Sequence, residues 1–140
     1  MSGETGWEIE EVFEGSGIYQ LISASSGKSL IEGFAKKKGN REAAAKLVST
    51  LAQIRRAGIP RSVENMTIRR LDGDIAEVRV SGTVVRAFSY QKDGERALVL
   101  LSIERTHQGS GNVRRHIEAV RPKAEAARKL LDSMKGVGND

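Results

Sequence analysis

The chain of 140 residues contains no cysteine, which excludes a disulfide framework and any metal site built on thiolates. It also lacks a run of eighteen apolar residues, so we expect no segment to span a membrane. Residues 1–14 are acidic and show no charged-then-apolar signal pattern, which makes a cytoplasmic protein the expectation. The only two histidines, His107 and His116, have no acidic neighbour at helical spacing, so we expect neither a metal site nor a cofactor.

Charge is unevenly distributed along the chain, whose formal net charge is +5. Residues 1–32 hold one basic and six acidic side chains, whereas residues 33–140 hold 22 basic and 12 acidic ones. A basic surface of this density suits a polyanionic partner such as nucleic acid or the ribosome, and equally an acidic protein. A solvated surface without a partner is the plain alternative.

The length fits a single domain over residues 1–140, with residues 1–6 and 136–140 expected to be flexible. Residues 7–13 read as a first strand. Residues 18–24 read as either a second strand or an extended lead into a helix, and periodicity does not separate the two.

A helical hairpin is predicted next. Ser29 and Glu32 have the spacing of a capping box, which begins a short helix ending at Gly39. Asn40 is placed to cap a longer helix over residues 41–57. One apolar stripe at three- and four-residue spacing follows this helix: Ala44, Leu47, Leu51 and Ile54.

From residue 66 the period of the apolar positions changes to two, which is typical of strands. Residues 66–71 approach a strand, and clearer strands are predicted at 75–80, 83–90 and 97–104. Their short connections make these three antiparallel neighbours. Residues 113–134 predict a final helix, with Pro122 as a kink or a restart. This order predicts an α+β domain with its helices on one side of an antiparallel sheet.

Alternation along the strands gives the sheet two chemically different faces. We expect the helical hairpin to pack on the face that bears Val78 and Val85. In the last strand, strict alternation sets Val99, Leu101 and Ile103 opposite Leu98, Leu100, Ser102 and Glu104. The second face carries Arg79, Arg86, Phe88 and Tyr90, and arginines beside aromatics suit phosphate contact with base stacking. Such arginines are also ordinary on the wet face of an antiparallel sheet.

Three segments, residues 71–79, 85–90 and 98–105, resemble the RelE/HigB toxin superfamily, and most closely its phage-derived, HigB-like branch. The resemblance extends over roughly residues 29–131. It implies a RelE-like fold and the toxin of a type II toxin–antitoxin pair. Many such toxins cleave mRNA in the ribosomal A site, so the implied partners are the ribosome, mRNA and a cognate helix-turn-helix antitoxin.

The resemblance assigns the family's basic positions to Arg79, Arg86 and Arg105. RNA cleavage of this class passes through a negatively charged phosphorane, which fixed guanidinium groups stabilise. We expect Arg86 and Arg105 to do this and Arg79 to hold the phosphate backbone. The alternative for Arg79 is a cross-strand ion pair with Glu77 or another carboxylate.

Two residues are candidates for proton transfer. His107 lies in a polar loop beside Arg105 and has an ordinary pKa near neutrality, although a loop histidine is often only solvated. Tyr90 would stack on a base or carry a proton, or else be a half-buried aromatic of the sheet. His116 reads as a surface residue or a ribosome contact. Further residues expected to contact RNA are Phe88, Lys92, Arg114 and Arg115.

The chain departs from the family pattern at two places. Glu104-Arg105 stands where HigB-like toxins carry a Lys-Lys pair, and Ser89 stands where they carry an aromatic. These departures leave two alternatives to the ribonuclease: a ParE-like gyrase inhibitor, or a catalytically inactive nucleic-acid-binding or regulatory protein on the same fold.

Overall fold

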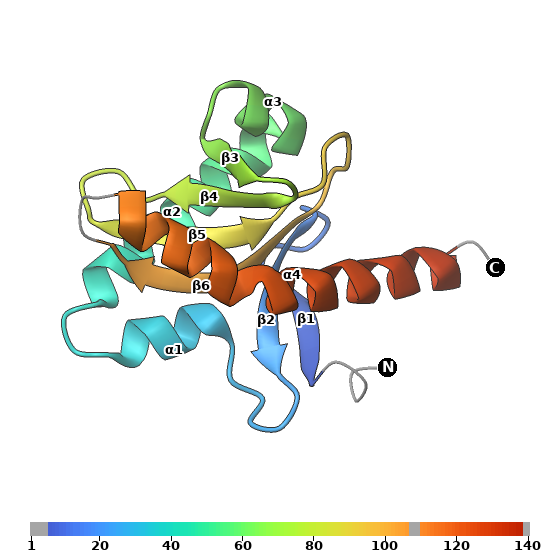
Figure 1. The fold of residues 1–140 in the computed structure, drawn as a ribbon, viewed down its shortest axis with the longest axis horizontal. Helices are drawn as coiled ribbons and strands as arrows, with labels where there is room; N and C mark the ends of the chain where they lie inside the picture. The colour runs from blue at the N-terminus through green and yellow to red at the C-terminus, as the bar shows by residue number, and fades with distance from the viewer. Residues whose placement is uncertain (1–5, 107–109, 139–140) are drawn as a thin grey trace.

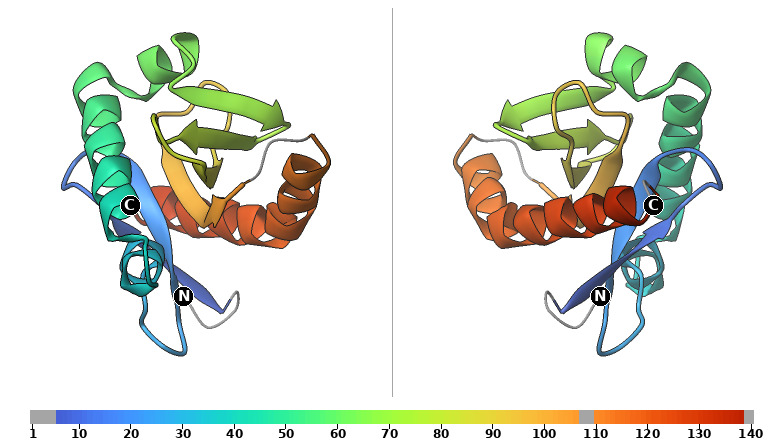
Figure 2. Two further views of the ribbon diagram at one scale, coloured as in Figure 1. Left: turned by 90° about the vertical axis from the view of Figure 1, so that its left-hand side faces the viewer. Right: turned by 90° about the vertical axis from the view of Figure 1, so that its right-hand side faces the viewer.

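The computed structural model describes residues 6–106 and 110–138, except for the side chains of 110–112 and 136–138. The fold is α+β, with one six-stranded mixed sheet and helices on both of its faces (Figures 1 and 2). The strands are β1 (Trp7–Glu11), β2 (Ile18–Ser23), β3 (Ile68–Asp72), β4 (Ile75–Arg79), β5 (Val85–Tyr90) and β6 (Leu98–Arg105). The helices are α1 (Leu30–Lys36), α2 (Arg41–Ala57), α3 (Ile59–Glu64) and α4 (Ser110–Gly138).

The predicted helical hairpin is confirmed as α1 and α2. Ser29 caps α1, because its Oγ accepts a hydrogen bond from the backbone N–H of Glu32 at 3.3 Å. Gly58 ends α2 with φ 90°, a conformation that glycine adopts readily. The chain then turns directly into α3, which the sequence analysis did not predict. Pro60 lies in the first turn of α3, where its missing N–H costs nothing.

The sheet has the strand order β1-β2-β6-β5-β4-β3. The predicted meander is confirmed, because β4 pairs antiparallel with β5 and β5 with β6. Residues 18–23, which the sequence left open, form a strand. The expectation of a purely antiparallel sheet is wrong, because Ile18–Gln20 of β2 pair in parallel with Leu98–Leu100 of β6. The chain between β2 and β6 runs through the three helices α1 to α3 and the strands β3 to β5, which provides the long connection that parallel neighbours need.

Helices cover both faces of the sheet, so the expectation of helices on one side is wrong. The face bearing Val78 and Val85 packs under α1, α2 and α3, as predicted for the helical hairpin. The opposite face packs against α4 (Figure 2). Each face therefore supports a hydrophobic core of its own.

A β-bulge in the β5–β6 pair changes which β6 side chains share a face. The register shifts between Phe88 and Ser89. As a result, Leu98, Leu100 and Ile103 lie in the core under the helical hairpin, while Val99 and Leu101 lie in the core under α4. The strict alternation expected for this strand is therefore wrong, because an inserted residue reverses the facing beyond it.

The final helix is longer than the predicted 113–134 and is continuous through Pro122. Its axis changes direction along its length (Figure 2), as expected for a helix with an internal proline. Among the described helices, none combines the length and the apolar character needed to cross a membrane.

Candidate functional site

Arg79 and Arg86 lie directly opposite one another on β4 and β5. Both line a cavity of about 380 Å³ at the end of the β4–β5 hairpin, together with the hairpin turn and Thr106 at the end of β6. Pairing in register on rigid strands holds the two guanidinium groups side by side. The prediction that Arg79 and Arg86 lie on the same face of the sheet is therefore confirmed.

Glu77 lies beneath the arginine pair and is fully buried. Its Oε2 accepts a hydrogen bond from Arg86 Nη1 at 2.9 Å, and its Oε1 lies 3.7 Å from Arg79 Nε. Oε1 has no hydrogen-bond partner among the described residues. The ion-pair alternative for Arg79 is thus observed, along the same strand rather than across the sheet.

The two arginines differ in how available they are to a ligand. Arg86 is held by the strong charge-assisted bond to Glu77, and its side chain is only 16% exposed. Arg79 makes the longer contact and is 58% exposed. Two cations over one buried carboxylate leave one net positive charge, which favours an anion at the cavity. Arg79 is the group most able to bind it.

The aromatic side chains expected to stack on bases are buried under α4. Phe88 is 0% exposed and Tyr90 is 3% exposed. Phe88 instead stacks on the ring of His116 at a centroid distance of 5.1 Å. The expectation of an exposed aromatic face is therefore wrong, because the final helix covers it. His116, expected at the surface, is half-buried there, because its ring stacks on Phe88.

Arg105 does not join Arg86. The register places Arg86 opposite Glu104, so Arg105 points to the other face of the sheet. There Arg105 Nε donates to Asn40 Oδ1 at 2.7 Å, and Nη2 donates to the Gly39 carbonyl at 2.9 Å. Asn40 consequently makes no side-chain cap on α2, contrary to the expectation. The predicted pairing of Arg86 with Arg105 at one phosphate is wrong for this reason.

The proton-transfer candidates lie apart from the arginine pair. His107 falls outside the described residues. Tyr90 lines a second cavity of about 180 Å³ with Asp74 and Arg128. Burial, reinforced by the nearby carboxylates of Asp74 and Glu95, raises the pKa of Tyr90 to about 12. At neutral pH Tyr90 is therefore protonated and is a poor base.

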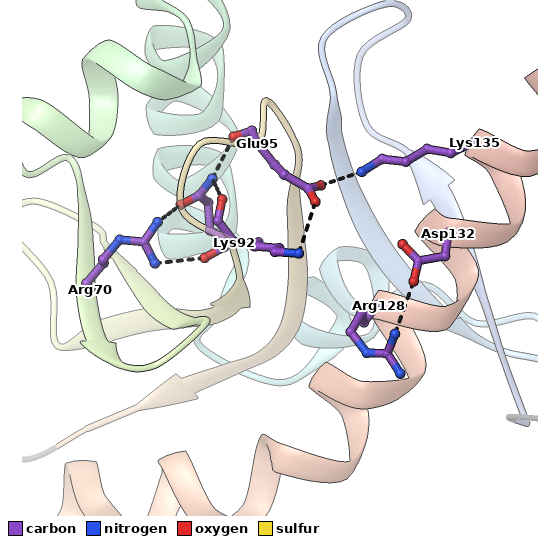
Figure 3. A network of polar contacts seen from close by, with 7 residues as sticks. Arg70, Lys92, Glu95, Arg128, Asp132 and Lys135 are labelled. Atoms are coloured by element: carbon purple, nitrogen blue, oxygen red, sulfur yellow. Dashed lines mark hydrogen bonds and ion pairs between the residues drawn. The ribbon is translucent and has the colours of Figure 1, made fainter. Parts of the chain in front are cut away.

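The remaining predicted RNA contacts lie in other parts of the surface. Lys92 belongs to a polar network that ties the β5–β6 loop to β3 and α4 (Figure 3). In it, Arg70 Nη1 donates to the Gln91 carbonyl at 2.9 Å, and Lys135 Nζ donates to Glu95 at 2.8 Å. Lys92 Nζ lies 4.0 Å from the same Glu95.

On α4, Arg114 lies 3.6 Å from Asp72, and Arg115 is exposed.

Alternation in the sequence was enough to predict that Arg79 and Arg86 lie on the same face. It gave no signal for the burial of Glu77 or for the position of His116 on Phe88, since both depend on tertiary packing. Across the described residues, no cluster of three or more His, Asp or Glu side chains is arranged to hold a metal ion.

The chain was compared with family models, with curated proteins and with solved structures, and none of the three comparisons found a match.

Proposed function

We propose that this protein acts on RNA, with the Arg79–Arg86 cavity as its phosphate-binding site. Its specific form would be the ribosome-dependent mRNA endoribonuclease of a type II toxin–antitoxin pair. The observation that carries the proposal is the direct pairing of Arg79 with Arg86 around one cavity. These are two of the three basic positions on which the RelE/HigB resemblance depends. The proposal places the protein in the cytoplasm, with the ribosome, mRNA and a helix-turn-helix antitoxin as partners.

The chemistry required of the site is charge stabilisation. Attack of a ribose 2′-OH on the adjacent phosphate gathers negative charge on the phosphorane oxygens, and a preorganised guanidinium stabilises that charge. Arg79 supplies an accessible guanidinium, and Arg86 holds a second one rigidly against Glu77. Among the described side chains, His116 stacks on Phe88, which lies on the same face of β5 as Arg86, and its imidazole is our candidate for proton transfer.

The variant that tests the proposal best is Arg79→Ala. Arg79 is exposed and its contact with Glu77 is long, so its removal leaves the Arg86–Glu77 bond in place. Arg56→Ala, at an exposed position of α2, is the matched control. Each protein is induced in bacteria, growth is followed, and mRNA 5′ ends are mapped by primer extension. We expect wild type and Arg56→Ala to arrest growth with new 5′ ends, and Arg79→Ala to lose roughly a hundredfold in cleavage rate.

A binding measurement supports the growth assay. Purified protein is titrated with single-stranded RNA at several salt concentrations. Removing one phosphate contact should lower the slope of log affinity against log salt by about 0.7 for Arg79→Ala. A folded Arg79→Ala protein with full toxicity and an unchanged salt slope would contradict the assignment.

A second candidate is a nucleic-acid-binding or regulatory protein without catalysis. The observation that favours it is the buried Glu77, which takes up the charge of Arg86, together with the burial of both aromatics. RNA binding with neither growth arrest nor new 5′ ends would select this candidate. Growth arrest with halted replication and gyrase-linked DNA breaks would select the ParE-like alternative.

A further inference from the structure

A separate cavity, of about 430 Å³, lies between the loop after β2, helix α1, the end of β6 and helix α4. It forms where β2 separates from β6. The β2–β6 pairing spans only Ile18–Gln20 and Leu98–Leu100, so the edge of β6 beyond Leu100 faces α1 instead of a strand (Figure 1). Residues 102–104 of β6 form one wall of this opening.

Three lysines line this cavity: Lys28, Lys37 and Lys123. Of these three described side chains, none forms an ion pair with a carboxylate, although Lys123 Nζ lies over the Trp7 ring at 5.4 Å. Glu104 is the single acidic residue in the lining. The cavity therefore carries an excess of positive charge that the described part of the chain does not neutralise.

Ser102 adds an independent indication of a ligand. Ser102 is one of the residues that line the same cavity and is 6% exposed, and its Oγ is buried with no hydrogen-bond partner among the described residues. Leaving a buried hydroxyl unpartnered is unfavourable for the folded chain. A ligand oxygen in the cavity would satisfy it.

We propose that this cavity binds a small phosphorylated molecule that carries hydroxyl groups, such as a sugar phosphate or a nucleoside monophosphate. The lysines would hold the phosphoryl group, and Ser102 would donate to one of its oxygens. Glu104 only accepts hydrogen bonds when ionised, which suits a hydroxyl group of the ligand rather than its phosphate. The volume falls in the range of small-molecule sites.

The loop sequence Gly27-Lys28-Ser29 ends like a nucleoside triphosphate loop, but the cavity is not one. Ile22 stands where such a loop carries its first glycine. The amides at the start of α1 are already used: Ile31 N–H donates to the Gln20 side chain, and Glu32 N–H donates to Ser29. Binding therefore depends on side chains, which favours a single phosphoryl group over a triphosphate.

Trp7, the only tryptophan, provides a direct readout because it contacts Lys123. The full chain is titrated with ribose 5-phosphate, adenosine monophosphate and inorganic phosphate, followed by tryptophan fluorescence and by backbone amide shifts in NMR spectra. We expect the two organic phosphates to shift the amides of Lys28 and Ser102, and to bind more tightly than inorganic phosphate. Tighter binding of ribose 5-phosphate would identify the ligand as a sugar phosphate, and tighter binding of adenosine monophosphate would identify it as a nucleoside monophosphate. No shift at these amides with any of the three probes would overturn the proposal.

Variants separate a binding role from a structural one. Lys28→Gln should weaken binding about tenfold or more, whereas Lys129→Gln, an exposed position of α4 outside the cavity, should not. Ser102→Ala should weaken binding while leaving the melting temperature of the free protein unchanged or higher, because it removes an unpartnered hydroxyl. A Ser102→Ala protein that melts lower and binds normally would show that the hydroxyl is structural. Binding that persists in Arg79→Ala would show that this cavity is independent of the proposed RNA site.

Discussion

Glu77 contacts both Arg79 and Arg86, and it holds Arg86 in place more strongly than Arg79. It is a fully buried carboxylate whose Oε2 is paired with Arg86 and whose Oε1 has no hydrogen-bond partner among the described side chains. Breaking a buried ion pair from one side is costly, because the remaining charge stays buried and uncompensated. The sequence placed Arg86 on what would be the wet face of the sheet. In the structure its side chain is only 16% exposed and is bonded to Glu77.

We predict that Arg86→Ala lowers the free energy of unfolding by about 3–5 kcal/mol, because it strands the Glu77 carboxylate. The double variant Glu77→Gln/Arg86→Gln removes both charges and should recover a large part of that loss. Urea denaturation measures both effects, with Arg56→Ala as the control. An Arg86→Ala protein as stable as the control would show that the bond to Glu77 contributes little.

Gly17 shows a second constraint at the residue scale. Its φ is +77°, and a Cβ added there would lie 2.5 Å from the carbonyl oxygen of Arg96. Gly15 has a similar φ of +75°, but nothing lies within 4 Å of its added Cβ. The two positions thus share the cost of the left-handed conformation and differ in the clash.

We predict that Gly15→Ala destabilises the protein by about 1–2 kcal/mol, the cost of the conformation alone. Gly17→Ala should cost more than this, because the carbonyl that it meets belongs to the backbone entering β6. Thermal melts of the two variants provide the comparison. Equal losses would mean that the loop before β6 moves away from the clash freely.

At the scale of elements, α4 decides which side chains remain accessible. It buries Phe88 and Tyr90 and is tied to the sheet end by ion pairs on its surface. Arg121 Nη2 lies 2.5 Å from Asp72, the last residue of β3, and also pairs with Glu118 one turn earlier in the helix. Hydrogen bonds from Arg121 lower the pKa of both Asp72 and Glu118, and a hydrogen bond from Arg128 lowers that of Glu125.

These shifts predict how the attachment of α4 responds to acid. A carboxyl whose pKa is lower in the folded state stabilises the fold above its unfolded pKa, near 4, and loses that contribution as pH falls through its folded pKa. We therefore expect stability to decrease as pH falls below about 4. The decrease should be smaller in Arg121→Gln, because this variant has already lost two of the lowered pKa values. Thermal melts across this pH range test it, and identical profiles for the two proteins would contradict it.

At the scale of the whole molecule, the sheet is shared by two cores. Leu51 of α2 lies in the core under the helical hairpin, and Leu101 of β6 lies in the core under α4; both are fully buried. Because β4, β5 and β6 contribute to both cores, loss of packing on one face should weaken the other.

We predict that Leu51→Ala and Leu101→Ala each lower the free energy of unfolding by about 2–5 kcal/mol within one cooperative transition. The dependence on denaturant concentration should stay the same, since both variants unfold the same surface. Exposed Gln53→Ala is the control. Two separate transitions in either leucine variant would show that the halves unfold independently.

The elements whose signals are local could be predicted from the sequence. The capping of α1 by Ser29, the extent of α2 and the antiparallel meander of β4 to β6 follow from spacing, turn residues and short connections, all of which lie within a few residues of one another. The placement of Arg79 and Arg86 on one face follows from the same local alternation, whereas their direct opposition also depends on the register of β4 with β5. Long-range packing sets the other features: α4 covers the aromatic face, a bulge reverses the facing along β6, and Arg105 turns toward Asn40 while Glu77 is buried beneath Arg86. Each of these depends on contacts between segments far apart in the chain, and such contacts leave no periodic pattern in the sequence.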